Sequence, residues 1–224
     1  LHHVFYVPVW STALGGQMEL GGKLVQGAQN IYFAQLADPA TKEFSMDAVR
    51  FLVGKYPFMM GGLPGAALAM YHTVPEMRRE EVKGLYFGAG FTSFLTGITE
   101  PIEFTFLFLA PKLFGIHVLG AGLAFLSCHV LGIAIGTTFS DGFLDFAIFV
   151  LLQGVSKTRW PYLVLLSLVY FFVYYFIFRY FIVKWDVKVP GRDDGEAKLF
   201  SKKDFLEKDG KVDENDLRSE IITR

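Results

Sequence analysis

Residues Pro161–Val183 read "PYLVLLSLVYFFVYYFIFRYFIV" and carry a single charged side chain, that of Arg179. An α-helix rises about 1.5 Å per residue, so roughly 20 apolar residues in a row cross the hydrocarbon core of a bilayer. Residues Leu113–Gly136, "LFGIHVLGAGLAFLSCHVLGIAIG", form a second such run without any formal charge. Uninterrupted apolar runs of this length are rare as buried helices of a small soluble protein. We therefore predict two full transmembrane helices.

The whole-chain averages conceal where the charge lies. The chain has 224 residues, of which 19% are charged, and its net charge is −1. However, 19 of its 43 charged side chains fall within residues 188–224. That segment has few aromatic residues, and this composition predicts a flexible linker or tail. Residues 1–187 are correspondingly apolar and are predicted to form a membrane domain.

Three further apolar runs are shorter or interrupted. They are Pro57–Tyr71, Gly84–Pro111 and Gly142–Val155. Short or broken hydrophobic segments are typical of discontinuous or re-entrant helices. Irregular backbone is tolerated at membrane depth only where protein buries it or a wet cavity receives its polar groups. The predicted fold is therefore an all-α integral membrane domain with broken or re-entrant helical hairpins around a transport path.

Two polar stretches and the single cysteine complete this outline. Residues Gln17–Lys55 are rich in Gly and turn residues, and we expect an extramembrane or interfacial excursion there. Residues His72–Gly84 are predicted to be a solvated loop or a short surface helix between membrane segments. Cys128 lies inside an apolar run, so we expect a packed, inert thiol and neither an internal disulfide nor a multi-cysteine metal site.

The stretch "GITEPIEF", Gly97–Phe104, places two carboxylates and a proline in apolar surroundings. Pro101 disfavours the helical conformation in Glu100, so a helix should start or stop there. With proline in the first turn, the next backbone N–H groups would face the region beside Thr99 and Glu100. A hydroxyl, a carboxylate and backbone donors at membrane depth suit a polyol such as a sugar.

Glu103 follows Glu100 by three residues and can share its helix face. Two neighbouring carboxylates raise the pKa of one of them, which would provide a proton acceptor. The alternative for Glu103 is a structural role, in which its carboxylate caps the broken helix. His117 and His129 lie within an apolar run without acidic neighbours in the sequence, and we interpret both as structural.

The stretch "LTGITEPIEFTFLFLAP", Leu95–Pro111, resembles the signature of the membrane-embedded C-domain (EIIC) of enzyme II permeases. These belong to the bacterial phosphoenolpyruvate-dependent sugar phosphotransferase system, in its glucose, glucoside and N-acetylglucosamine superfamily. Other stretches that agree with it are "LHHVFY" (Leu1–Tyr6), "GLPGAALAMYHT" (Gly62–Thr73) and "FSDGFLDF" (Phe139–Phe146). The later "DVKVPGRDD" is similar to the linker toward the family's B-domain, although the family more often has Thr before this Pro. On this basis residues 1–187 are the C-terminal part of the EIIC domain, and residues 188–224 are the linker.

The resemblance implies a sugar permease whose transport is coupled to phosphorylation of the sugar. The phosphocysteine of a B-domain would donate the phosphoryl group to a sugar hydroxyl. Glu100 would bind that hydroxyl and help to remove its proton, and His2 would hydrogen-bond the sugar. His3, Thr99 and Glu103 would support the site. Glucose is the expected sugar, with maltose-type glucosides and N-acetylglucosamine as alternatives, and neither a metal nor another cofactor is expected.

The same resemblance implies the partners and the location. The expected partners are the B- and A-domains of the system and membrane lipid, with no nucleic acid. Members of the family form homodimers through N-terminal helices, and an Arg before the His pair joins their sugar site. This chain begins after both features, so we expect a fragment that is inactive alone. The expected location is the bacterial plasma membrane, crossed several times. Lys184, Lys188 and Arg192 after the last span favour a cytoplasmic tail.

Two other functions remain open at the level of the sequence. One is an ion-coupled secondary sugar transporter in which Glu100 and Glu103 form the ion site. The other is a membrane scaffold without transport activity, whose charged tail recruits partners.

Overall fold

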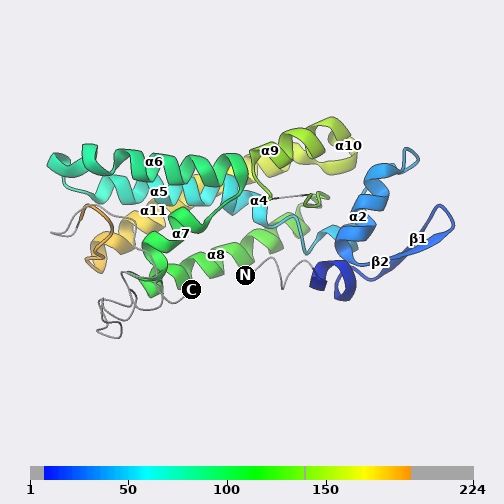
Figure 1. Cartoon of the computed structure of the whole chain (residues 1–224), viewed down its shortest axis with the longest axis horizontal. Coiled ribbons are helices and arrows are strands. Elements are labelled where there is room, and N and C mark those ends of the chain that lie inside the picture. The colour runs from blue at the N-terminus through cyan, green and yellow to red at the C-terminus, as the bar shows by residue number, and fades with distance from the viewer. Residues whose placement is uncertain (1–7, 139, 193–224) are drawn as a thin grey trace, which may run out of the picture.

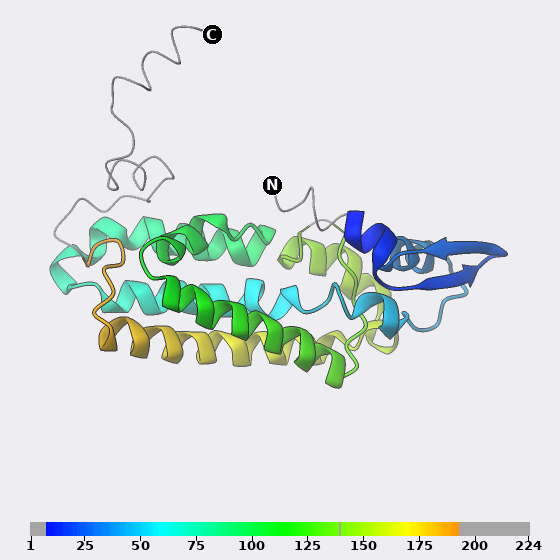
Figure 2. The ribbon, with the colours of Figure 1, turned by 90° about the horizontal axis from the view of Figure 1, so that it is seen from below.

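A computed structural model describes residues 8–138 and 140–192, which form an elongated helical bundle with a small β-hairpin at one end (Figure 1). The principal helices of the bundle are α5 (Leu63–Thr73), α6 (Arg79–Thr96), α7 (Glu100–Leu107), α8 (Pro111–Val130) and α11 (Trp160–Lys184). Seen from below, α8 and α11 run along one long side of the bundle while α6 lies on the other (Figure 2).

Helices α8 and α11 are long and apolar enough to cross a membrane, so both predicted spans are confirmed as helices of that kind. Helix α8 ends at Val130, six residues before the end of the predicted run. Gly132 adopts a left-handed conformation with φ of +66°. The Ile133 N–H then donates to the Cys128 carbonyl at 3.0 Å, and the Gly132 N–H to that of His129 at 3.1 Å. This pattern is a Schellman motif, which ends a helix at a glycine despite apolar residues beyond it.

The Pro57–Tyr71 run is helical without interruption, so the predicted break there is wrong. It comprises α4 (Lys55–Pro57), a π-turn η2 (Phe58–Gly62) and α5. Such a π-helical turn adds a residue to the helix without ending it. Gly61 and Gly65 face α11 so closely that an added Cβ would overlap the carbonyl oxygens of Ser167 and Phe171, respectively. Small residues four apart allow this close approach of two helix backbones.

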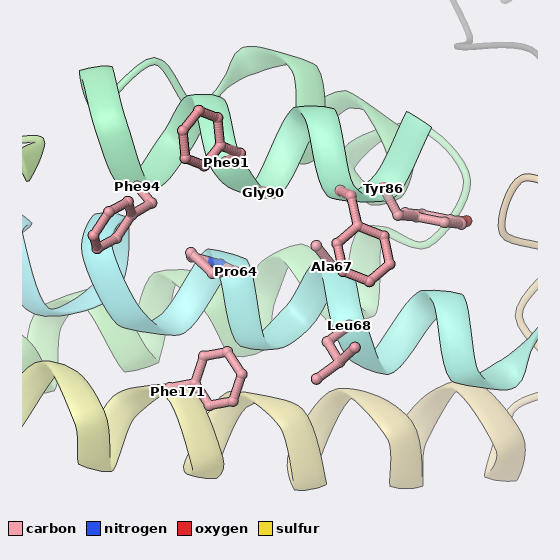
Figure 3. Close-up of a pocket in the computed structure, with 9 residues that line it drawn as sticks. Pro64, Ala67, Leu68, Tyr86, Gly90, Phe91, Phe94 and Phe171 are labelled. Atoms are coloured by element: carbon pink, nitrogen blue, oxygen red, sulfur yellow. The ribbon is translucent and has the colours of Figure 1, made fainter. Parts of the chain in front are cut away.

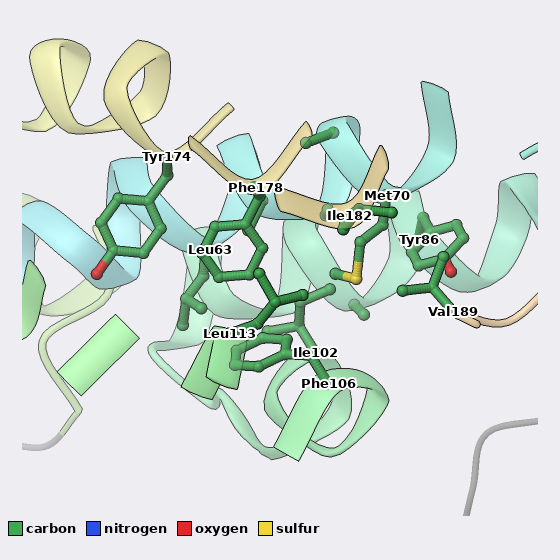
Figure 4. Packing of buried hydrophobic residues seen from close by; sticks show 14 of the residues in the cluster. Leu63, Met70, Tyr86, Ile102, Phe106, Leu113, Tyr174, Phe178, Ile182 and Val189 are labelled. Atoms are coloured by element: carbon green, nitrogen blue, oxygen red, sulfur yellow. The ribbon is translucent and has the colours of Figure 1, made fainter. Parts of the chain in front are cut away.

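The main core lies where α5, α7, α8 and α11 meet. Figure 4 shows the side chains that fill it, among them Leu63, Met70, Ile102, Phe106 and Phe178. The rings of Phe106 and Phe178 pack edge to face with centroids 5.2 Å apart. This packing fixes α7, although it has only eight residues, against two long helices.

The N-terminal part departs from the all-α prediction. Strands β1 (Gln17–Leu20) and β2 (Lys23–Gln26) pair antiparallel, with Gln17 opposite Gln26. The two residues between them, Gly21 and Gly22, both have positive φ, as a type I′ hairpin turn requires. The flanking elements are η1 (Val9–Ala13), α2 (Ala28–Ala37) and α3 (Met46–Val49).

The remaining elements lie at the two ends of the bundle. They are η3 (Glu76–Arg78), α9 (Phe143–Asp145), η4 (Phe146–Val150), η5 (Leu151–Gln153) and α10 (Val155–Thr158). The charged His72–Gly84 stretch therefore supplies η3 and the first turns of α6. Cys128 is buried, as predicted. Beyond α11 the chain turns back onto α6, where the Tyr86 hydroxyl donates to the Pro190 carbonyl at 2.8 Å.

Candidate functional site

The turn between α6 and α7 is the break that the sequence predicts within Gly84–Pro111. Gly97 adopts φ of +69°, and its N–H donates to the Ser93 carbonyl at 2.9 Å, which closes the last turn of α6. The Gly97 backbone lies directly against the backbone of Ser140 and Gly142, in the loop that follows α8. Two segments that are more than 40 residues apart in sequence thus meet at this turn.

Thr99 and Glu100 form the tip at which α7 begins. Thr99 is buried, with 9% of its surface exposed, and Glu100 is half-buried. The Thr99 carbonyl accepts hydrogen bonds from the backbone N–H groups of Ile102, at 3.1 Å, and Glu103, at 2.9 Å. The sequence predicts that the N–H groups after Pro101 face a ligand. These two N–H groups do point back to Thr99, but its carbonyl accepts both of them, so their role toward a ligand stays untested.

Glu103 pairs with a residue that sequence reasoning assigned a structural role. Its Oε1 lies 3.4 Å from Nε2 of His117 on α8, and His117 Nδ1 lies 3.2 Å from the Tyr174 hydroxyl on α11. His117 has no acidic neighbour within its own apolar run, but the fold brings Glu103 to it from α7. Its interpretation as a structural residue stays a prediction. Glu103 and His117 are each seven residues from Ala110, where the chain reverses between α7 and α8. Equal spacing about a hairpin turn was the signal that could have paired them.

The chain Glu103–His117–Tyr174 is mostly shielded from solvent. The side chain of Glu103 is 23% exposed and that of His117 is 6% exposed. The Tyr174 hydroxyl also donates to the backbone carbonyl of His117 at 3.2 Å. A partly exposed carboxylate backed by an imidazole and a phenol can accept hydrogen bonds or a proton from a ligand beside α7.

An apolar groove lies elsewhere on the bundle. It has a volume of about 260 Å³ and opens between α5, α6 and α11 (Figure 3). Its lining consists almost entirely of apolar and aromatic side chains, including Pro64, Leu68, Phe91, Phe94 and Phe171. A sugar needs hydrogen-bonding partners for its hydroxyls, so this groove is unsuited to one.

The two predicted site histidines, His2 and His3, lie outside the described residues. In the described residues that follow this pair, the first buried side chain is that of Trp10, in η1. The Lys55 ammonium lies 4.1 Å from the centroid of the Trp10 ring. Thr99, Glu100 and Glu103 are therefore the predicted site residues whose surroundings can be described, and α7 carries two of them with Thr99 as its cap.

Comparison with known families supplies the context for this geometry. The family model for the EIIC component of the phosphotransferase system matches residues 1–122, more than half of the chain. The matched region includes the α6–α7 turn, Glu100, Glu103 and His117. A chain with two candidate membrane spans and this match is a membrane component that works with the EIIA and EIIB components and a sugar substrate. The protein belongs to the phosphotransferase system EIIC family, the sugar permeases of that system.

Proposed function

We propose that this protein binds a hexose at the tip formed by Thr99 and Glu100 and carries it across the membrane for phosphorylation. The observation that carries this proposal is the placement of a half-buried carboxylate at a helix start, next to the buried Thr99 and within a bundle that contains two candidate spans. Carboxylates are rare within membrane segments, and those present there commonly mark substrate or ion pathways. We further propose that the α6–α7 turn is the tip of a re-entrant hairpin.

The proposed chemistry is phosphoryl transfer from a phosphocysteine of the B-domain. The S–P bond of the phosphocysteine breaks, a P–O bond forms to the sugar hydroxyl, and the cysteine leaves as a thiolate. The hydroxyl proton passes to the carboxylate of Glu100. This chain supplies position and proton acceptance, and these contributions suit a reaction in which proteins mainly orient the reactants and stabilise charge.

The other site residues would bind the sugar or support Glu100. His2 and His3 would contact the sugar, and the buried hydroxyl of Thr99 would hold the tip. Glu103 would act through its pairing with His117, which directs its carboxylate at 3.4 Å toward α8. Membership of the EIIC family favours this function over an ion-coupled transporter and over a scaffold.

Several finer points belong to the same proposal. The chain would be the C-terminal, sugar-carrying part of a domain in the glucose superfamily, and glucose is the first candidate substrate. It would form a homodimer through helices that precede it, and would be a multi-pass protein of the bacterial plasma membrane. Residues 188–224 would lead to a cytoplasmic B-domain. Phosphorylation would require that domain, so the isolated chain would be inactive as a phosphotransferase.

The experiment is sugar binding by calorimetry on the intact, detergent-solubilised permease that contains this chain. Glucose, maltose and N-acetylglucosamine are titrated into wild type, Glu100→Gln and His2→Ala. The matched control is Glu80→Gln, which removes a carboxylate that pairs with Lys83 at 3.4 Å on the exposed face of α6. We expect one sugar to bind wild type and the control, and both site variants to lose binding while they remain folded.

Binding that survives both site substitutions would show that Glu100 and His2 are structural. A second measurement separates the proposed coupling from ion-driven transport. Membrane vesicles without the phosphoryl donor should not accumulate the sugar. Accumulation driven by a proton or sodium gradient alone would contradict the proposal.

A further inference from the structure

A buried ion pair joins α4 to the loop that precedes α9. The Nζ of Lys55 lies 2.7 Å from Oδ2 of Asp141, whose side chain has no exposed surface, while that of Lys55 is 13% exposed. The Thr137 hydroxyl donates to the other carboxylate oxygen of Asp141. Asp141 itself has φ of +62°, a left-handed conformation that residues with a side chain rarely adopt. The pair thus holds a strained backbone position.

A second buried carboxylate, that of Asp145, lies four residues further along the chain. Asp145 accepts the backbone N–H groups of Thr138 at 3.2 Å, Ser140 at 3.4 Å and Asp141 at 3.2 Å. The Thr138 hydroxyl also donates to it. The Tyr56 hydroxyl lies 3.3 Å from Asp145 and 3.2 Å from the Gly136 carbonyl. The Asp145 carboxylate therefore accepts hydrogen bonds from the backbone of Thr138, Ser140 and Asp141.

This network touches two segments that the proposed sugar site needs. On one side, Ser140 and Gly142 lie against Gly97, two residues before Thr99. On the other side, the Lys55 ammonium lies over the ring of Trp10, in the chain that follows His2 and His3. The same loop thus contacts the turn that leads to Glu100 and, through Lys55, the element that follows the histidine pair.

A buried ionic network adds little to the net free energy of folding, because desolvation of its charges offsets their attraction. Removing two carboxylates and an ammonium from water costs free energy that apolar packing of similar volume would not, although such groups can fix a unique geometry. A fully bonded polar network is also rigid, since each member constrains the others. The network is therefore better suited to fixing the positions of residues 137–138 and 140–142 than to stabilising the bundle.

We propose that Lys55, Asp141 and Asp145 are positioning residues of the sugar site. They fix residues 137–138 and 140–142, and the contacts of Ser140 and Gly142 with Gly97 in turn set the α6–α7 turn and thus Thr99 and Glu100. This inference rests on the proposed function. None of the three is proposed to touch the sugar, so their effect on binding is indirect.

The test compares sugar affinity with stability in the intact permease. Asp145→Asn keeps the size of the side chain but places an amide N–H₂ among N–H donors. We expect the Kd for the sugar to rise roughly 10-fold or more, because an amide among N–H donors leaves a buried donor without an acceptor and releases the loop. Tyr56→Phe removes one hydroxyl from the network and is the milder variant, should Asp145→Asn fail to fold. Its Kd should rise severalfold.

The control is Ile182→Ala, which opens a cavity in the core at the end of α11 that lies away from α9 (Figures 1 and 4). It should lower the unfolding temperature without changing the Kd measured well below that temperature. If Asp145→Asn and Tyr56→Phe also lower only the unfolding temperature, the network is structural and the inference is overturned. If wild type binds none of the sugars, the proposed function itself fails, and the inference fails with it.

Discussion

Replacing Gly97 by alanine should disrupt the turn that carries Thr99 and Glu100. Gly97 has φ of +69°, and a Cβ built on it would lie 2.7 Å from the Ser140 carbonyl carbon and 2.9 Å from the Gly142 nitrogen. It would also overlap the Ser140 carbonyl oxygen. These are backbone atoms, so no side chain can rotate away to make room.

Two costs combine in this variant. A left-handed conformation costs a residue with a Cβ about 1–2 kcal/mol. To reach ordinary contacts of about 3.5–4.0 Å, the two backbones must separate by more than about 1 Å, because the Ser140 carbonyl oxygen lies closest of all. Overpacking of this kind typically costs about 1–3 kcal/mol. We therefore expect Gly97→Ala to reduce the free energy of unfolding by about 2–5 kcal/mol. Sugar affinity should fall as well, because the turn is displaced.

Two glycine variants separate these costs in unfolding measurements on the solubilised protein. Gly16 has φ of +68° and open space around its Cβ position, so Gly16→Ala carries the left-handed cost alone. Gly88 lies within α6 with nothing near its Cβ position, and Gly88→Ala should stabilise the protein by about 0.5–1 kcal/mol. If Gly97→Ala is no less stable than Gly16→Ala, the close packing of the turn against Ser140 and Gly142 does not exist.

Two other substitutions test the helix contacts. Gly65→Ala should cost about 1–3 kcal/mol by forcing α5 away from the Phe171 carbonyl on α11, whereas Gly84→Ala, with open space around it, should not destabilise; thermal unfolding compares the two. Tyr174→Phe removes the hydroxyl beside His117 and should cost about 1 kcal/mol in the same assay, and an unchanged stability would contradict that hydrogen bond.

Features set by local chemistry could be predicted from the sequence. The two long apolar runs became α8 and α11, and the Glu100–Pro101 pair marked the start of α7, because proline in the first turn acts on its immediate neighbours. The Pro57–Tyr71 run was misjudged for a related reason. Its glycines resemble a break in the sequence, but they serve close packing against α11, which depends on a distant partner.

The candidate site also combines features that local sequence predicts with features that depend on distant partners. Thr99, Glu100 and Glu103 could be selected because polar groups are costly within an apolar run. The pairing of Lys55 with Asp141 joins residues 86 positions apart, and no local pattern encodes it. The roles of His2 and His3 stay predictions, since both precede the described residues.

The lengths of the two candidate spans have a consequence for the surrounding lipid. At about 1.5 Å per residue, the 20 residues of α8 match a hydrocarbon core of roughly 30 Å, whereas the 25 residues of α11 exceed it by several ångströms. As a membrane span, α11 would therefore tilt or extend into the headgroup region, where Tyr180, Lys184 and Trp185 are suited to lie. Since close glycine contacts join α11 to α5, a change in bilayer thickness that alters this tilt would also move α5.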